Sequence, residues 1–252
     1  MALPAPSPDV FDFLARVACA YATLIASPHA DSESGLGGSL FYAGEMDEAG
    51  RALLVAANIA GAATLVASAD LATQKQAIRD AIADFLVTSL DEALRILKNQ
   101  LRKRETVSVC VAMAPAAMER EMNERGVQPD LLRSAVDDTP GIGVDSPALL
   151  TWSVASAPAQ SLPQLDALAL ACLDAGDWAA RRWLRLAPRY LGRMAQGIRA
   201  LVCSRDVASR FIEQVQKCVE RGEIGVPVEI RWRDTRGHEE HQFVSAKSPP
   251  RS

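Results

Sequence analysis

The chain has 252 residues, enough for one large domain or for a domain with a smaller appendage. Apolar residues make up 49% and charged residues 23% of the sequence, as is typical of globular proteins. The net charge of −4 excludes a general electrostatic attraction for nucleic acid or for an anionic membrane. We also find no apolar run of about eighteen residues that would indicate a membrane span.

The N-terminus and the cysteines point to a cytoplasmic protein. Residues 1–8 carry no basic segment before an apolar run, so we expect no signal peptide. The five cysteines are scattered and odd in number, and Cys110 and Cys218 are predicted to be buried, reduced thiols. His238 and His241 are neighbours without further ligands at metal-binding spacing, so we expect no metal site.

Strand and helix patterns alternate through the first half of the chain. Residues 9–28 carry apolar side chains at three- and four-residue steps, which predicts an amphipathic helix, and a Ser/Gly-rich run ends at Gly38. Strands are predicted at 40–43, 64–67, 84–88 and 107–112, and helices at 48–60, 71–82, from Leu90, and from Pro115 to Gly126. This alternation predicts a parallel βαβ sheet of the Rossmann-like kind, covered by helices on both faces.

The second half of the chain predicts a smaller α/β portion. We interpret 149–154 as an edge strand within a Pro/Gly/Ser-rich stretch, followed by helices at 162–175 and 178–187, a strand at 198–203, a helix from Ser204 to Arg221 and a strand at 226–232. The expected fold class is α/β. The expected divisions are an N-terminal helix and linker (1–38), a Rossmann-like domain (39–133), an irregular connection (134–160), a C-terminal α/β portion (161–234) and a polar, frayed tail (235–252).

Two ordered series of segments resemble one enzyme family. The first is VTSLDEAL at 87–94, VSVCV at 107–111 and ERGVQPDLL at 124–132. The second is RWL at 182–184, GIRALV at 197–202 and RGEIGVPVEI at 221–230. In order and spacing they resemble urocanase (urocanate hydratase), an enzyme of histidine degradation. The resemblance implies a cytoplasmic lyase that adds water across urocanate, with tightly held NAD acting as an electrophile.

The chain departs from the family's pattern at several functional positions. The glycine-dense turn after the first strand reads GEMDEAG at 44–50, so only Gly44 and Gly50 carry over as NAD-binding residues. The family's acidic residue at the end of the second strand falls at Ser68, with Asp70 two positions on. Its cysteine-bearing segment has no counterpart in 134–160, and its late Arg-Asp-His sequence is reduced to Arg233-Asp234.

Each carried-over residue also has a structural interpretation. Gly44 and Gly50 fit a simple strand-to-helix turn in which Asp47 caps the helix, and Asp70 fits an N-cap as well as it fits a ribose ligand. Asp234 is either the family's late acid or a surface residue.

A run of arginines between 181 and 199 carries Arg182 and Arg199, with aromatic residues interleaved. It is either a site for a carboxylate or phosphate, or a solvated helix face that pairs with Asp174 and Asp177.

These observations predict a reduced, catalytically impaired urocanase-like protein that retains nucleotide or partner binding. An active NAD-dependent urocanate hydratase and a non-enzymatic nucleotide- or partner-binding module remain as alternatives. The expected partners are a small-molecule ligand, and either a second copy of the chain or a protein of histidine degradation. The helix at 9–28 is the candidate dimerisation element, because its Ala-rich apolar face needs cover. Nucleic acid and membranes are not expected partners.

Overall fold

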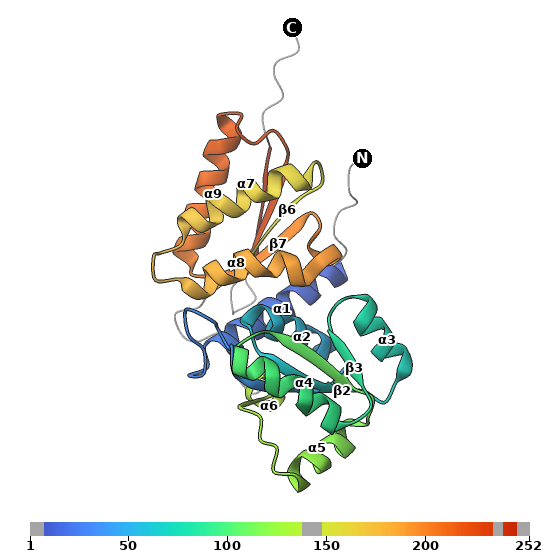
Figure 1. The fold of residues 1–252 in the computed structure, drawn as a ribbon. Helices are drawn as coiled ribbons and strands as arrows, with labels where there is room; N and C mark the ends of the chain where they lie inside the picture. The colour runs from blue at the N-terminus through green and yellow to red at the C-terminus, as the bar shows by residue number, and fades with distance from the viewer. Residues whose placement is uncertain (1–7, 138–147, 234–238, 246–252) are drawn as a thin grey trace. The chain divides into compact units, whose positions relative to one another are not determined.

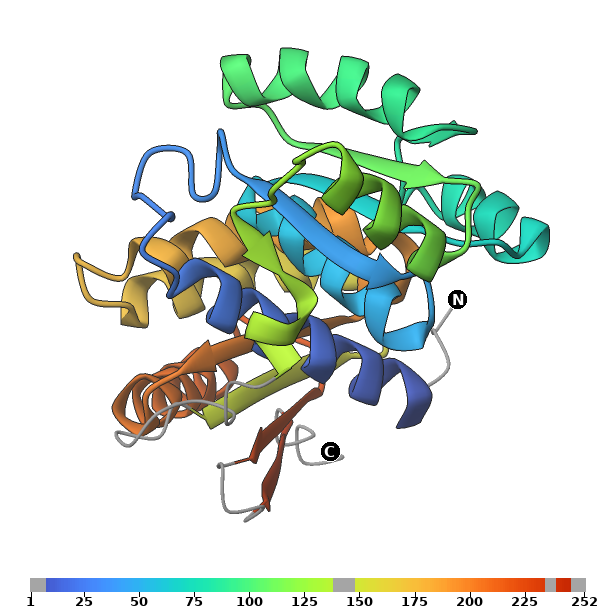
Figure 2. The same cartoon turned by 90° about the horizontal axis from the view of Figure 1, so that it is seen from below.

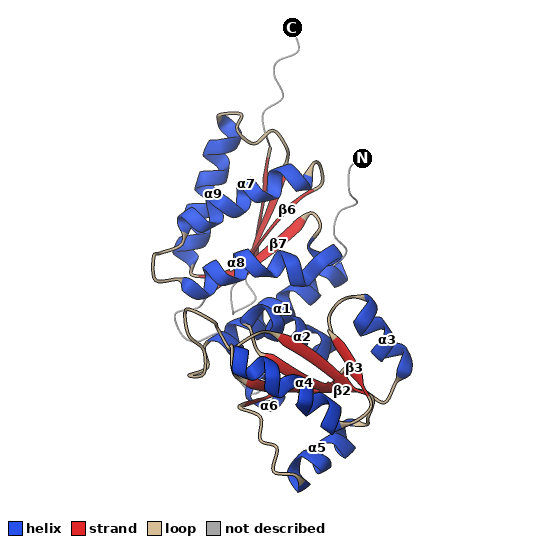
Figure 3. Ribbon diagram, in the orientation of Figure 1, coloured by secondary structure: helices blue, strands red, loops and turns tan. Residues whose placement is uncertain are grey.

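The computed structural model describes residues 8–137, 148–233 and 239–245 (Figure 1). The chain divides into two compact units, one of residues 19–140 and one of residues 1–18 and 141–252. Each unit contains its own sheet, as the colouring in Figure 3 makes clear. Helix α1 (Pro8–Ile25) contributes residues to both units.

The unit of residues 19–140 is a five-stranded parallel sheet in the order β3-β4-β2-β1-β5, which confirms the predicted Rossmann-like class. The two-residue strand β5 was not among the predicted strands. The elements, in chain order, are β1 (Leu40–Glu45), α2 (Glu48–Ala60), β2 (Ala63–Ala67), α3 (Leu71–Arg79), β3 (Phe85–Val87), α4 (Leu90–Lys103), β4 (Val107–Val111), α5 (Pro115–Glu124), β5 (Leu131–Leu132) and α6 (Arg133–Asp137).

Helices cover both faces of this sheet (Figure 2). On one face, alternate residues of β1, β2 and β4 pack against α4 and α5 through Leu90, Leu97 and Met118. Helix α2 packs against β1 and β2, and every residue from Ala52 to Ala60 is buried. The unbroken apolar runs in β2 and β4 follow from this burial on two sides.

Local hydrogen bonds end or begin several helices where the sequence predicts it. Gly61 ends α2 in the left-handed conformation, with φ of 97°. Asn58, near the end of α2, donates from Nδ2 to the carbonyl of Ile82 at 3.0 Å. Helix α4 begins with an N-cap, since Ser89 Oγ accepts the Glu92 N–H at 3.3 Å, while Glu92 Oε2 accepts the N–H of the preceding Thr88 at 2.9 Å.

The second unit contains a four-stranded antiparallel sheet in the order β7-β6-β8-β9. The interpretation of 149–154 as an edge strand is therefore wrong, because β6 pairs with β7 on one side and β8 on the other. Within the polar tail, residues 239–244 form strand β9 instead of fraying. The elements are β6 (Ala148–Val154), α7 (Pro158–Cys172), α8 (Trp178–Leu191), η1 (Gly192–Ala195), β7 (Ile198–Cys203), α9 (Arg205–Glu220), β8 (Val228–Arg233) and β9 (Glu239–Val244).

Tryptophans form the core of this unit. Trp152 of β6 is fully buried, and the centroid of its ring lies 4.8 Å from the centroid of the Phe211 ring in α9. Trp183 of α8 is 3% exposed and donates its indole N–H to the carbonyl of Ala200 in β7. The arginine-rich helix α8 thus packs against the sheet through the aromatic residue that interrupts its basic run.

Helix α1 is the element that the sequence suggested for dimerisation. Its apolar residues Leu14, Val17, Tyr21 and Leu24 are all at most 4% exposed. An uncovered apolar face therefore no longer argues for a partner at this helix. None of the helices in the described part of the chain has the length and hydrophobicity that crossing a lipid bilayer requires.

The turn between β1 and α2 requires a close approach of two backbone segments. A Cβ on Gly50 would lie 1.9 Å from the carbonyl oxygen of Glu45. No larger residue fits at position 50 unless the backbone moves, because real Cβ contacts are never this short.

We expect Gly50→Ala to destabilise the parallel unit by more than about 3 kcal/mol, the upper end of overpacking costs. The matched control is Gly176→Ala, where a Cβ meets nothing within 4 Å. Gly176→Ala should change the free energy of unfolding by no more than about 0.5 kcal/mol. Urea unfolding followed by far-ultraviolet circular dichroism is the measurement, because all four tryptophans lie at 152–232 and report on the other unit. Equal stability of the two variants would contradict the proposed clash.

Candidate functional site

The strand order places a topological switch point between β1 and β5. From β1 the chain passes through α2 to β2 on one side, and after α5 it returns to β5 on the other side. In open parallel α/β sheets, ligands bind outside the carboxyl ends of the strands at such a point. The candidate site therefore lies where β1 and β5 end.

A cavity of about 810 Å³ opens at this point. This volume is within the range of small-molecule sites, roughly 300–1,000 Å³. Three parts of the unit contribute to it, namely the end of β1, the inner side of α5, and β5 with the start of α6. The lining residues are Tyr42, Gly44, Glu45, Pro115, Glu119, Met122, Asn123, Val127, Gln128, Pro129, Leu132, Arg133 and Ser134.

The turn that carries Gly44 and Gly50 forms one edge of this cavity. Gly44 has a φ of 72°, and a Cβ there would lie 3.2 Å from Cδ of Arg133. Glycine at position 44 thus provides both the left-handed conformation and the room for the arginine side chain. The structure therefore places both glycines at the turn where the resemblance expects the cofactor phosphates.

Asp47 occupies the helix N-terminus in this turn. Its Oδ1 accepts the Gly50 N–H at 2.6 Å, so Asp47 is the N-cap of α2, and the capping interpretation is confirmed. Nη1 and Nη2 of Arg133 each donate to one oxygen of the same carboxylate at 3.1 Å. Partial burial acts to raise the pKa of Asp47, but hydrogen bonds from Arg133 and Gly50 prevail and lower it.

Tyr42 and Glu119 form a second polar contact in the cavity. The Tyr42 hydroxyl donates to Glu119 Oε1 at 3.4 Å, and Tyr42 is 4% exposed. Burial, and then the neighbouring carboxylate of Glu119, raise the pKa of Tyr42 above its ordinary value. The phenol therefore stays protonated at neutral pH and can serve only as a hydrogen-bonding group there.

Asp70 caps helix α3, and Ser68 supports the loop before it. Asp70 accepts the N–H groups of Ala72 and Thr73 and the Thr73 hydroxyl, at 3.3, 2.8 and 2.6 Å. These bonds from Thr73 and Ala72 lower the pKa of Asp70. Ser68 is 5% exposed and its Oγ accepts the Asp70 N–H at 3.2 Å. Both side chains thus stabilise the loop after β2, as the N-cap interpretation of Asp70 predicts.

In this conformation the turn does not fit a dinucleotide pyrophosphate. A phosphate at the N-terminus of α2 would need the Gly50 N–H, which the Asp47 carboxylate already occupies. The side chains of Glu45 and Glu48 are exposed beside it and would add repulsion. An anion could bind here only after Asp47 had left the cap.

The remaining candidates lie in or beyond the second unit. Arg182 is partly exposed in α8. Arg199 in β7 pairs through Nε with Asp166 of α7 at 3.1 Å, and both side chains are less than 20% exposed. Arg181 of the basic run donates to the backbone carbonyls of Leu173 and Asp174, whereas the Asp174 carboxylate pairs with Arg210 of α9 at 3.3 Å. Asp234 lies outside the described residues.

Sequence reasoning missed Arg133, Tyr42 and Glu119. Arg133 follows the two-residue strand β5, which is too short for a periodic pattern. One signal was available, since the alternation of strands and helices calls for a strand after α5, and Leu131-Leu132 is the apolar pair at that place. Across the described residues, no three His, Cys, Asp or Glu side chains gather as a metal site would require.

Comparison with known families identifies the parallel unit. Residues 17–140 match the family described as the urocanase Rossmann-like domain, in agreement with the resemblance drawn from the sequence. A comparison with curated proteins finds no match. The matched segment nearly coincides with the compact unit of residues 19–140. The unit formed by residues 17–140 is therefore a Rossmann-like domain of the urocanase family.

Proposed function

We propose that this chain is a catalytically impaired relative of urocanase in which an internal ion pair closes the turn for the cofactor phosphates. One observation carries the proposal, namely that the Asp47 carboxylate both caps α2 and holds Arg133 through two hydrogen bonds. The family's fold is kept, while the anion-binding capacity of the helix N-terminus is used within the chain itself.

Covalent attachment gives the Asp47 carboxylate an advantage over a free phosphate. A group tethered beside its binding site acts at a high effective concentration. The apparent affinity of the site for a dissolved anion is lowered accordingly. Displacing Asp47 also brings the bound polyanion beside the exposed carboxylates of Glu45 and Glu48, which repel it. These costs support weak NAD binding and, with it, a loss of NAD-dependent hydration of urocanate.

The cavity next to the turn supports retained ligand binding. It is lined by the protonated Tyr42, the carboxylate of Glu119 and apolar residues of α5 such as Met122. These groups suit a ligand that carries hydrogen-bond acceptors and donors without a phosphate. We infer that the impaired enzyme binds a small molecule of this kind at the switch point.

The purified chain should contain no NAD and should leave urocanate unchanged over hours. We expect this because the Asp47 carboxylate closes the turn. Mass spectrometry of the denatured protein detects any bound NAD, and the absorbance of urocanate with and without added NAD follows its conversion. Co-purified NAD together with turnover would show an active hydratase and overturn the proposal.

Asp47→Ser should raise affinity for inorganic pyrophosphate by about tenfold or more, because serine keeps the cap while the Asp47 carboxylate no longer competes with the phosphate for Arg133. Asp70→Ser is the matched control, since it makes the same change at the N-cap of α3, where no arginine donates to the cap. Its affinity should equal that of the wild type in calorimetric titrations. Adding Arg133→Ala to Asp47→Ser should remove the gain. An unchanged affinity in Asp47→Ser would show that the ion pair does not close the turn.

The coupling between Asp47 and Arg133 should disappear in acid. The pKa of Asp47 is lower in the folded chain than its unfolded value of about 3.9, so its stabilising contribution is full above that pH and is lost as the pH falls through the folded-state pKa. A double-mutant cycle of Asp47→Asn and Arg133→Gln should give about 0.2–1 kcal/mol at neutral pH. Urea unfolding across the acid range measures it, and a coupling that is constant with pH would contradict the assignment.

A further inference from the structure

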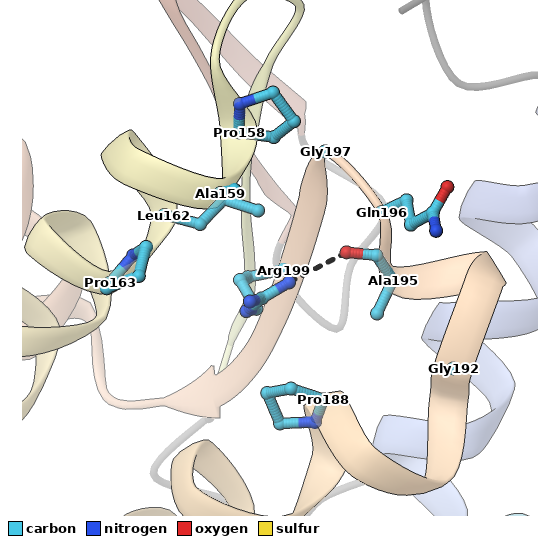
Figure 4. Close-up of a pocket in the computed structure, with 10 residues that line it drawn as sticks. All are labelled: Pro158, Ala159, Leu162, Pro163, Pro188, Gly192, Ala195, Gln196, Gly197 and Arg199. Carbon is cyan, nitrogen blue, oxygen red and sulfur yellow. Dashed lines mark hydrogen bonds between the residues drawn. The ribbon is translucent and has the colours of Figure 1, made fainter.

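A second cavity lies wholly within the antiparallel unit, outside the segment that matches the urocanase domain. Its volume is about 550 Å³, within the range of small-ligand sites. It is formed by the start of α7, the end of α8, η1 and the start of β7 (Figure 4). The lining residues are Pro158, Ala159, Leu162, Pro163, Pro188, Gly192, Ala195, Gln196, Gly197 and Arg199.

The chemistry of this cavity comes from one cation in apolar walls. Proline, leucine and alanine side chains surround it, and the guanidinium of Arg199 lies among them in Figure 4. The amide of Gln196 is the other polar side chain in the lining, and apolar walls with few polar groups are typical of pockets that hold a compact organic molecule in one orientation.

The hydrogen bonds of Arg199 leave one nitrogen available. Nε donates to Asp166 Oδ2 at 3.1 Å, and Nη1 donates to the carbonyls of Ala195 and Ile198 at 2.7 and 2.9 Å. Within the described part of the chain, Nη2 makes no hydrogen bond. These three bonds fix the plane of the guanidinium, so Nη2 is held in place to donate to one acceptor oxygen.

The surrounding charge favours an anionic acceptor. The segment from Trp178 to Arg199, which forms one side of the cavity, contains six arginines and no aspartate or glutamate. Asp166 offsets one of these charges through its bond to Arg199. Because the Arg199 guanidinium is a cation, a carboxylate at Nη2 would form a charge-assisted hydrogen bond.

We propose that this cavity binds a small organic monocarboxylate with a compact apolar body, whose carboxylate accepts end-on from Nη2 of Arg199. The site does not depend on the state of the turn at Asp47, since every residue that forms it lies in the other unit. It assigns a binding role to Arg199 of the basic run.

The test is an NMR titration of the ¹⁵N-labelled full-length chain with benzoate, and with benzamide as the neutral isostere. Benzoate should shift the backbone amides of Gly192, Gly197 and Arg199. Benzamide should bind more weakly than benzoate by at least about tenfold. In the variant Ala159→Trp, an exposed lining residue is enlarged to fill the cavity, and benzoate affinity should fall by about tenfold or more. Ala167→Trp is the control on the same helix, at an exposed residue outside the lining.

Three results would overturn the proposal. The first is an absence of benzoate-induced shifts at about 10 mM ligand, well above the range of a specific weak site. The second is equal affinity for benzamide, which would exclude recognition of the carboxylate. The third is an equal effect of Ala167→Trp and Ala159→Trp. The shift map of the wild-type chain locates the site even where a variant folds poorly.

Discussion

The hydrogen bond from the Gly50 N–H to the Asp47 carboxylate is the contact on which the parallel unit's site depends. It starts α2 immediately after β1, and the same carboxylate holds Arg133 from beyond β5. Gly50 makes this geometry feasible, because any side chain there would meet the backbone of Glu45. The two strands on either side of the switch point are thus connected by one aspartate.

A helix N-terminus favours any anion, whatever its origin. In a dinucleotide-binding fold the anion is the cofactor's pyrophosphate, and in this chain it is a side chain of the turn itself. The N–H group at the start of the helix has a hydrogen-bond acceptor in both cases, so the fold itself does not require the cofactor. The Rossmann-like unit, which matches the urocanase domain, thus satisfies an N–H group at the start of α2 with its own carboxylate.

The antiparallel unit distributes one basic segment over several tasks. Trp183 directs α8 onto the sheet by donating to the Ala200 carbonyl. Arg181 ties the helix to the end of α7, and Arg199 is fixed by Asp166 at the edge of a cavity. A run of charged residues that alternates with aromatic residues therefore does not predict that the whole segment is exposed. The aromatic residues pack in the core, while the charged groups bond to polar atoms at its edge.

The sequence by itself determined the elements whose signals lie within a few residues. Helix α2 has the predicted bounds 48–60 and the predicted N-cap Asp47, and strand β7 has the predicted bounds 198–203, because periodicity and capping are local. Only the tertiary structure decided that β6 is a central strand, that 239–244 pairs with β8, and that Arg133 meets Asp47 across 86 residues of chain. Strand neighbours and cavities arise from contacts between distant segments, and no local pattern encodes which segments will meet.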